Sequence, residues 1–282
     1  MMMLKRMTTA EPRLLSLGGC TKPGVYEDIH SRFSSVLNFI MGDRIVSLCD
    51  ASHAPGPFRI ITTGLSLEEI TAVELSDDLL RLNASLLPVI VSDIYQPPVF
   101  TEPTDTDLLQ RNLCLSSKYL SQHASSDSLP VLLSDPASAP LSFQGQLAQS
   151  LRTGLDLFSL GKYREGTNAM KRRGMGLTPA GDDLLIGFLI GCSWLEVTRK
   201  KQLSKIRECV YFAALDNDLM VNTFLYQGYA LLVDEDWVDF LLDLSRSEIF
   251  SYRSMDRLMG HGASSGADQL LGFHQAVKLF GI

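Results

Sequence analysis

The chain has 282 residues, of which 45% are hydrophobic and 20% are charged. This length exceeds the roughly 150 residues of one typical domain, so we expect two domains; the composition excludes collagen-like, coiled-coil and wholly disordered chains. Its 25 Lys and Arg against 32 Asp and Glu give a net charge of −7. That sign is wrong for a protein that neutralises phosphates, so we expect no nucleic-acid partner.

The N-terminal sequence and the cysteines predict a cytoplasmic protein. The first 13 residues lack the apolar run of a secretory signal, and the most apolar stretch, 184–197, is shorter than the roughly 20 residues that span a bilayer. We therefore expect no membrane partner. The five cysteines are widely spaced and form no C-x-x-C pair, which is typical of small core residues in a reducing compartment.

Proline divides the chain, because eleven of the twelve prolines lie at or before Pro140. Proline is tolerated in turns and at strand edges but breaks helix interiors. We therefore predict an α+β fold with segregated halves. Its parts are a β-rich N-terminal domain (1–123), a Ser- and Pro-rich linker (124–140) and an all-helical C-terminal domain (141–282).

The local patterns agree with this division. Short β-branched runs bounded by Gly, Pro or Asp predict three strands, at 44–49, 58–62 and 88–94. Apolar residues at helical spacing predict helices in the second half, at 143–158, 163–173, 179–198, 203–230, 235–246 and 265–280.

Two of these helix starts share the pattern G-x-D-x-L-x-G-F. The pattern covers 181–188 and 266–273, and a glycine-rich loop precedes each copy: GMGLTPAG (174–181) and GHGASSG (260–266). The repeat is short, but its residues match position by position. We expect both copies to serve one purpose.

Both loops have the features of an anion site at a helix N-terminus. Hydroxyl residues supply candidate N-caps, other backbone N–H groups stay free, and the glycines indicate positive φ or an approaching ligand. The basic run 171–173 adds local positive charge. We therefore predict that a small anionic metabolite binds the loops. Its candidate binding residues are Gly176, Thr178, Gly181, Gly262, Ser264 and Ser265.

The repeat also predicts that two carboxylates meet. Asp183 and Asp268 each lie four residues before a glycine, Gly187 or Gly272, at which two helices can cross closely. We expect the carboxylates to approach one another there, together with His261, whose flanking glycines do not suit a packed core. The structural alternative is that each Gly-rich start with its acidic residues only stabilises a helix.

The strings GMGLTPAGDDLLIG (174–187) and GHGASSGADQLLGF (260–273) resemble the two signature loops of a bacterial family that includes the AllH subunit of oxamate carbamoyltransferase. The N-terminal half is similar to that family through residues 25–38 and 56–58. The resemblance implies an enzyme of purine catabolism that converts oxalurate and phosphate into oxamate and carbamoyl phosphate, with partner enzyme subunits.

The chain departs from the family pattern at two positions. Arg172 stands where the first loop usually opens with glycine, and Thr223 is the counterpart of a Ser-rich segment between the loops. We count Thr223 and Asp182 among the candidate substrate-binding residues. These departures leave the substrate open.

Carbamoyl transfer needs mainly positioning and stabilisation of a developing oxyanion. Asp183 and Asp268 would then accept carbamoyl N–H groups, and His261 would donate to the oxyanion or shuttle a proton. No cofactor is required.

Two other functions stay open at this point. A magnesium-dependent hydrolase would use Asp182, Asp183 and Asp268 as hard oxygen ligands. A noncatalytic ligand-binding or scaffold subunit would keep the loops for binding while a partner performs the chemistry.

Overall fold

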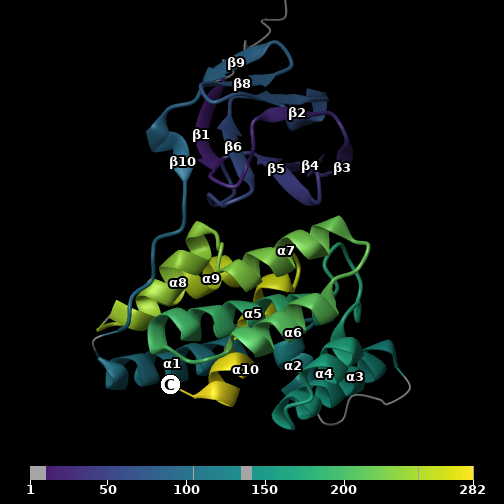
Figure 1. Cartoon of the computed structure of the whole chain (residues 1–282), viewed down its shortest axis with the longest axis vertical. Coiled ribbons are helices and arrows are strands. Elements are labelled where there is room, and N and C mark those ends of the chain that lie inside the picture. The colour runs from purple at the N-terminus through teal and green to yellow at the C-terminus, as the bar shows by residue number, and fades with distance from the viewer. Residues whose placement is uncertain (1–10, 104, 135–141, 247, 282) are drawn as a thin grey trace, which may run out of the picture. The chain divides into compact units, whose positions relative to one another are not determined.

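The structure is a computed structural model that describes residues 11–103, 105–134, 142–246 and 248–281. The chain divides into two compact units between Pro97 and Pro98. The first unit is built from strands and the second from helices (Figure 1), which confirms the predicted α+β fold.

Two sheets form the first unit. The larger has the strand order β10-β1-β6-β5-β4-β3, in which β5 and β6 are parallel, as are β1 and β10. Its strands are β1 (Arg13–Gly18), β3 (Ile29–Arg32), β4 (Val36–Met41), β5 (Arg44–Cys49), β6 (Arg59–Thr63) and β10 (Ile94–Tyr95). The predicted strands at 44–49 and 58–62 are therefore confirmed.

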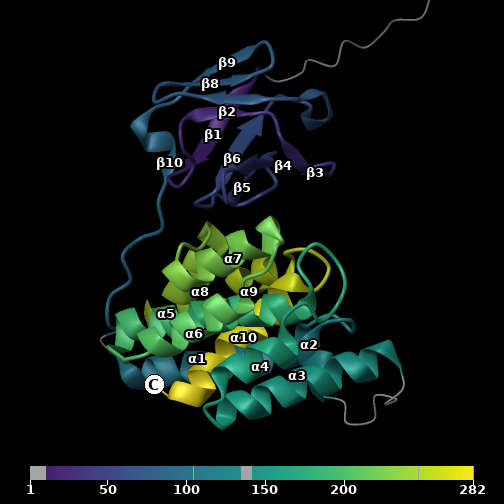
Figure 2. The same ribbon diagram turned by 45° about the vertical axis from the view of Figure 1, so that its right-hand side comes forward.

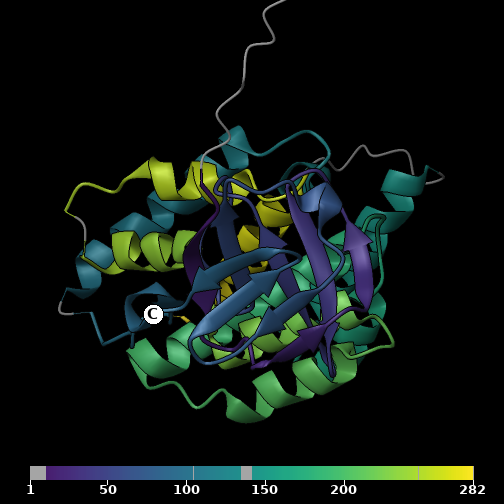
Figure 3. The ribbon, with the colours of Figure 1, turned by 90° about the horizontal axis from the view of Figure 1, so that it is seen from above.

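The smaller sheet is an antiparallel layer with the order β2-β7-β8-β9. Its strands are β2 (Gly24–Tyr26), β7 (Val73–Leu75), β8 (Leu79–Leu82) and β9 (Ser85–Pro88). Viewed from above, the blue strands of this sheet run across the purple strands of the larger one (Figure 3). The core of the unit contains fully buried residues of both sheets, among them Phe39, Leu48, Ile60 and Leu80.

The predicted strand at 88–94 is wrong over most of its length. Strand β9 ends at Pro88, and Val91–Asp93 form a single 3-10 turn before β10. The Asp93 side chain accepts the Ile90 N–H at 3.1 Å, which stabilises that turn, and Val91 is 87% exposed. The apolar run indicated a strand, but these residues have no sheet face to pack against.

Ten helices make up the described part of the second unit, and no strand occurs in it. They are α1 (Thr106–His123), α2 (Leu129–Ser134), α3 (Phe143–Ser159), α4 (Tyr163–Met170), α5 (Ala180–Arg199), α6 (Ser204–Ala214), α7 (Leu219–Ala230), α8 (Glu235–Arg246), α9 (Tyr252–Met259) and α10 (Ser265–Phe280). Figure 2 shows α3 and α4 side by side. Helix α5 packs against α4, α6, α7 and α10.

The boundary between the units lies earlier in the chain than the predicted boundary at residue 123. Helix α1 belongs to the helical unit, because its buried residues follow one face and pack against α8, α9 and α10. The predicted linker at 124–140 contains helix α2, while residues 135–141 lie outside the described residues. A count of prolines cannot detect such packing between distant helices.

The long helix predicted at 203–230 is two helices. The chain leaves the helical path at Leu215 and resumes after Asp218, whose carboxylate accepts the N–H groups of Met220 and Val221. This N-cap satisfies donors that a new helix exposes. Helices α6 and α7 both pack against α5.

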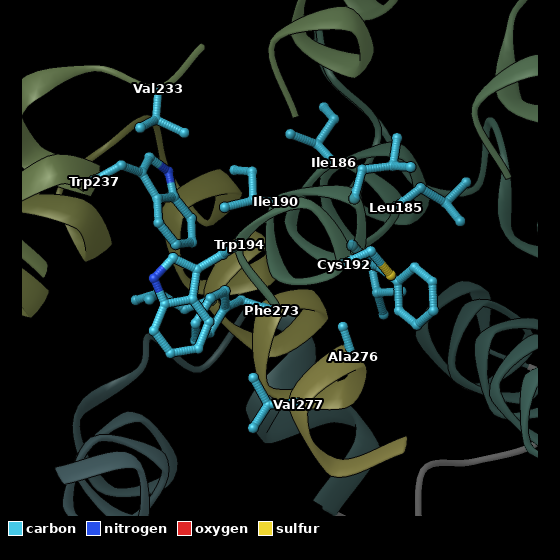
Figure 4. Packing of buried hydrophobic residues seen from close by; sticks show 14 of the residues in the cluster. Leu185, Ile186, Ile190, Cys192, Trp194, Val233, Trp237, Phe273, Ala276 and Val277 are labelled. Atoms are coloured by element: carbon cyan, nitrogen blue, oxygen red, sulfur yellow. The ribbon is translucent and has the colours of Figure 1, made fainter. Parts of the chain in front are cut away.

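Helix α5 is the centre of the helical unit. Sixteen of its 20 residues are buried, so its surface is apolar on all sides rather than along one stripe. Figure 4 shows Trp194 of α5 beside Phe273 of α10 and Trp237 of α8. The ring centroids of Trp194 and Phe273 lie 5.5 Å apart, and those of Trp237 and Phe273 lie 5.8 Å apart.

Helices α5 and α10 cross at the paired glycines of the repeat. A Cβ atom at Gly187 would lie 1.8 Å from the Gln269 carbonyl oxygen, and one at Gly272 would lie 2.0 Å from the Leu184 carbonyl oxygen. Leu184 and Gln269 are themselves equivalent in the repeat. Each helix therefore presents the same glycine to the same position of the other, and the interpretation of these glycines as packing residues is confirmed.

The cysteines are more varied than predicted. Cys49 and Cys192 are buried, but Cys20 and Cys209 are partly exposed and Cys114 is exposed; all five are free. Among the described helices, none is long and apolar enough to cross a membrane.

Candidate functional site

The two glycine-rich loops meet at the N-terminal ends of α5 and α10. The Thr178 and Ser265 hydroxyls share a hydrogen bond of 3.2 Å between the loops. A second hydrogen bond joins the same two segments: the Gln269 side-chain amide donates to Asp183 Oδ1 at 3.0 Å. Residues 86 and 87 positions apart in the chain are thereby joined in one polar cluster.

Asp183 is the most unusual member of this cluster. Its residue exposure is 1%, and no described residue donates a hydrogen bond to Oδ2. Burial raises the pKa of Asp183 to about 7, and this outweighs the lowering by Gln269, Ser265 and Thr178. A buried carboxylate without a full set of donors is costly, which marks this oxygen as a position for an additional donor.

Asp268 lies near Asp183 but is fully hydrogen-bonded. Burial raises its pKa to about 7, and the charge of Asp183 contributes to the rise. Oδ1 accepts the Leu129 N–H at 2.6 Å, and Oδ2 accepts the Ser264 hydroxyl at 3.0 Å. The carboxylate therefore ties the start of α2 to loop 260–266, a contact that the sequence pattern did not reveal.

Asp182 faces a different set of groups. It is fully buried; its Oδ1 accepts the Arg172 N–H at 3.1 Å, and its Oδ2 has no donor among the described residues. Burial raises the pKa of Asp182 to about 6, opposed by Arg172 and reinforced by Asp218 and Asp216. Asp182 therefore contacts the residues that precede the first loop, through Arg172, rather than the cluster around Asp183.

Arg172 explains one departure from the family pattern. Its φ of +61° lies in the left-handed region, where glycine is the usual residue. The guanidinium donates to Asp218 at 2.9 Å and lies 4.0 Å from Asp216. These ion pairs stabilise an arginine at a position whose backbone favours glycine.

The backbone N–H groups at the two helix starts are only partly free. The structure gives no backbone acceptor for Ala180, Ser265 and Ala267 among the described residues, whereas the other early N–H groups are used within the chain. Thr178 does not cap α5; the capping position is Pro179, whose carbonyl accepts the N–H groups of Asp182 and Asp183. Gly181 N–H donates to the Arg173 carbonyl.

Loop 260–266 uses its amides in the same way. Gly266 N–H donates to the His261 carbonyl, and Asp268 N–H donates to Ser264. The Ser264 hydroxyl caps no amide, because it donates to Asp268. These amides are therefore not donors for an anion.

The basic run 171–173 also serves other contacts. The Lys171 ammonium donates to the Ala213 carbonyl at 2.9 Å, Arg172 pairs with Asp218, and Arg173 Nε donates to the Ala169 carbonyl at 3.3 Å. The groups with the largest influence on the pKa of Asp183 include no cation. The expected positive charge therefore acts on Asp182, through Arg172, but no cation is among the groups that shift the pKa values of Asp183 and Asp268.

The glycines of the loops have structural reasons. Gly176 and Gly262 adopt φ of +103° and +62°, conformations that suit glycine. A Cβ atom at Gly181 would lie 2.0 Å from the Met170 carbonyl oxygen. The backbone conformation and packing of the two loops therefore require these glycines, with or without a ligand.

His261 is not exposed as its flanking glycines suggested. The Nε2 atom lies 2.9 Å from Asp236 Oδ2, and the side chain is 27% exposed. Arg257 binds the other oxygen of Asp236. Although burial acts to raise it, hydrogen bonds from His261 and Arg257 hold the pKa of Asp236 below its ordinary value. Asp236, on α8, was missed by the sequence reasoning.

Thr223 is buried in α7, and its hydroxyl donates to the Leu219 carbonyl of its own helix at 2.7 Å. Among the described residues, no three His, Cys, Asp or Glu side chains converge as metal ligands. The magnesium alternative built on Asp182, Asp183 and Asp268 is therefore not supported by their geometry.

Comparison with protein families adds one finding to this geometry. Residues 172–277 match the model of the family described as oxamate carbamoyltransferase subunit AllH. The match supports membership in the AllH family. No curated protein and no solved structure matches the chain.

The AllH match runs from Arg172, at the opening of the first loop, to Val277 near the end of α10. It therefore includes both loops, the crossing of α5 and α10, and the Asp236–His261 pair. The similarity at 25–38 and 56–58 lies outside the match and stays a prediction.

The buried carboxylates of the AllH segment predict a distinct pH dependence of stability. The pKa of Asp183 is raised from its ordinary 3.8 to about 7 in the folded chain, so its favourable contribution is complete below about pH 4 and is lost as the pH rises towards 7. Asp183→Asn removes this titration. Between pH 5 and pH 8, its free energy of unfolding is expected to rise by about 2 kcal/mol relative to the unsubstituted chain.

Urea unfolding at the two pH values measures this change, and Asp156→Asn on the exposed side of α3 is the matched control. A pH-independent difference between Asp183→Asn and the unsubstituted chain would show that Asp183 is already ionised at pH 5.

Proposed function

We propose that the chain is a subunit of a carbamoyl-transferring enzyme, with its small-molecule site where the two glycine-rich loops meet. The reaction that we assign to the assembled enzyme converts oxalurate and phosphate into oxamate and carbamoyl phosphate. The observation that carries the proposal is Asp183: a carboxylate 1% exposed, with Oδ2 lacking a donor, within the segment that matches the AllH family.

The chemistry requires little from the protein beyond positioning. A phosphate oxygen attacks the carbamoyl carbon of oxalurate, the bond from that carbon to the oxamate nitrogen breaks, and the proton of hydrogen phosphate passes to that nitrogen. Holding the two reactants in line supplies most of the acceleration in such a step. Asp183 orients the carbamoyl group by accepting its N–H, while Thr178 and Ser265 contact its other polar atoms.

His261 is the proposed group for the proton transfer. With Nε2–H donated to Asp236, the imidazole is held in the tautomer whose Nδ1 accepts a proton. In the described residues, Nδ1 makes no hydrogen bond. Asp236 thus acts on the reaction only through His261, by holding its ring in place.

Partner subunits and a small anionic metabolite belong to the same proposal. The family description names a subunit, and the reaction uses two anions. The alternative of a noncatalytic ligand-binding subunit is favoured by one observation: the His261 side chain is tied to Asp236, and neither residue is among the groups that shift the pKa values of Asp183 and Asp268.

His261→Ala decides between these two roles. In an assembled carbamoyl-transfer assay, loss of a proton shuttle is expected to lower kcat by at least about a hundredfold. The free energy of unfolding should fall by only about 1 kcal/mol, because Asp236 keeps its pairing with Arg257.

The control is Asp239→Asn, which removes the other carboxylate bound to Arg257 without touching His261. Full turnover in His261→Ala would assign the histidine to loop structure alone.

The reaction itself is tested by mixing the chain with the other subunits. Carbamoyl phosphate should form from oxalurate and phosphate only in the mixture, and its absence there would reject the proposed reaction.

A further inference from the structure

We propose that the site between the two loops binds the uncharged, N–H-rich end of its substrate, a carbamoyl or ureido group, and does not bind the anionic end. This inference rests on the proposed function and specifies which part of the substrate this chain holds. The anionic end is then held by groups outside the loop cluster.

The first observation is the surplus of acceptors in the cluster. Asp183 Oδ2 receives no hydrogen bond from the described residues, and Gln269 uses its amide N–H on Oδ1, which leaves its carbonyl oxygen as an acceptor. The hydroxyls of Thr178 and Ser265 share one hydrogen bond and lower the pKa of Asp183 by hydrogen bonding, but each also has lone pairs that can accept. A primary amide brings two N–H donors to such a set of acceptors.

The second observation concerns the donors that an anion would need. The amides of Gly181 and Gly266 already donate to carbonyl groups of the chain, whereas those of Ala180, Ser265 and Ala267 have no backbone acceptor among the described residues. What the cluster lacks is positive charge. Lys171 donates to Ala213, and Arg172 pairs with Asp218. A carboxylate or phosphate in the cluster would therefore meet Asp183 and Asp268 without compensating positive charge.

The repeat itself shows which carboxylate is adapted to a ligand. Asp268 has both oxygens engaged, by Leu129 and Ser264. Asp183, the equivalent of Asp268, accepts a hydrogen bond from Gln269. The residue equivalent to Gln269 in the first copy is Leu184, whose side chain has no polar group to offer Asp268. The two halves thus share a backbone but differ in their side chains. Of the two equivalent carboxylates, Asp183 keeps an oxygen without a donor among the described residues and Asp268 does not.

The test compares two ligands that differ only in the proposed contact. N-carbamoylglycine and N-acetylglycine carry the same charge and have nearly the same shape, but the first has an NH₂ group where the second has a methyl. Calorimetric titration of the full chain at pH 7.5 is expected to give at least about tenfold tighter binding of N-carbamoylglycine, since the methyl group leaves Asp183 without a donor. Inorganic phosphate alone should not compete with it.

Asp183→Asn is expected to reduce the preference below about threefold, while Asp156→Asn retains it. Equal binding of both ligands by the unsubstituted chain, or competition by phosphate, would overturn the inference. So would the absence of binding by either ligand. The assigned reaction fails separately, through the absence of carbamoyl phosphate from the assembled enzyme. Equal binding of the two ligands would leave that reaction standing but would remove the role of Asp183 in it.

Discussion

Gly187→Ala is expected to lower the free energy of unfolding by about 3 kcal/mol or more. The added Cβ would lie 1.8 Å from the Gln269 carbonyl oxygen, and this oxygen belongs to the backbone of α10, so no side-chain rotation relieves the overlap. Helices α5 and α10 must separate, which opens the core around Trp194 and Phe273. The gain in helix propensity, about 0.5–1 kcal/mol, offsets little of this cost.

A graded series of substitutions makes the measurement specific. At Gly191, the added Cβ would meet the Ala276 methyl at 2.7 Å, and an intermediate loss of about 1–2 kcal/mol is expected. At Gly260, the nearest atom lies at 3.1 Å and φ is −76°, so Gly260→Ala should change stability by no more than about 0.5 kcal/mol. Urea unfolding in which Gly187→Ala matched Gly260→Ala would contradict the close crossing.

Asp183→Ala should lower the turnover of the assembled enzyme by a hundred- to a thousandfold. The expected loss follows from the proposed contact: removing one buried polar group that orients the reacting carbonyl group typically costs about this much in rate. The fold should survive, because the substitution also removes the cost of burying an ionised carboxylate at neutral pH. Initial rates of carbamoyl phosphate formation measure the effect.

Two controls accompany this variant. Asp156→Ala, on an exposed helix surface, should retain full turnover. Asp268→Ala should lower the free energy of unfolding, because the Leu129 N–H and the Ser264 hydroxyl lose their acceptor. If Asp183→Ala retained full activity and stability, the carboxylate would have no role in the reaction.

Sequence patterns predicted the features that depend on local structure. The distribution of proline predicted the separate strand and helix halves, and the repeat predicted a close glycine crossing, since each pattern reflects a backbone requirement of nearby residues. The strand expected at 88–94 and the single helix expected at 203–230 were wrong. In both segments the apolar residues alone did not show where the chain turns. A carboxylate that accepts backbone N–H groups, Asp93 in the first and Asp218 in the second, fixes the turn there.

The chemistry of the loops could not be predicted in the same way. The partners of Asp183, Asp268 and His261 are Gln269, the Leu129 N–H and Asp236, at separations of 86, 139 and 25 residues. No periodicity relates such pairs, because they depend on which helices pack together. The sequence therefore indicated amides free for an anion, whereas the folded chain uses some of them internally, those of Gly181, Asp182 and Gly266.

A crystal structure of the full chain with oxalurate tests the proposed role of Asp183 directly. We expect oxalurate between loops 174–181 and 260–266, with its terminal carbamoyl nitrogen about 3 Å from an oxygen of Asp183. Oxalurate bound away from both loops, or bound there with its carboxylate against Asp183, would rule out this role.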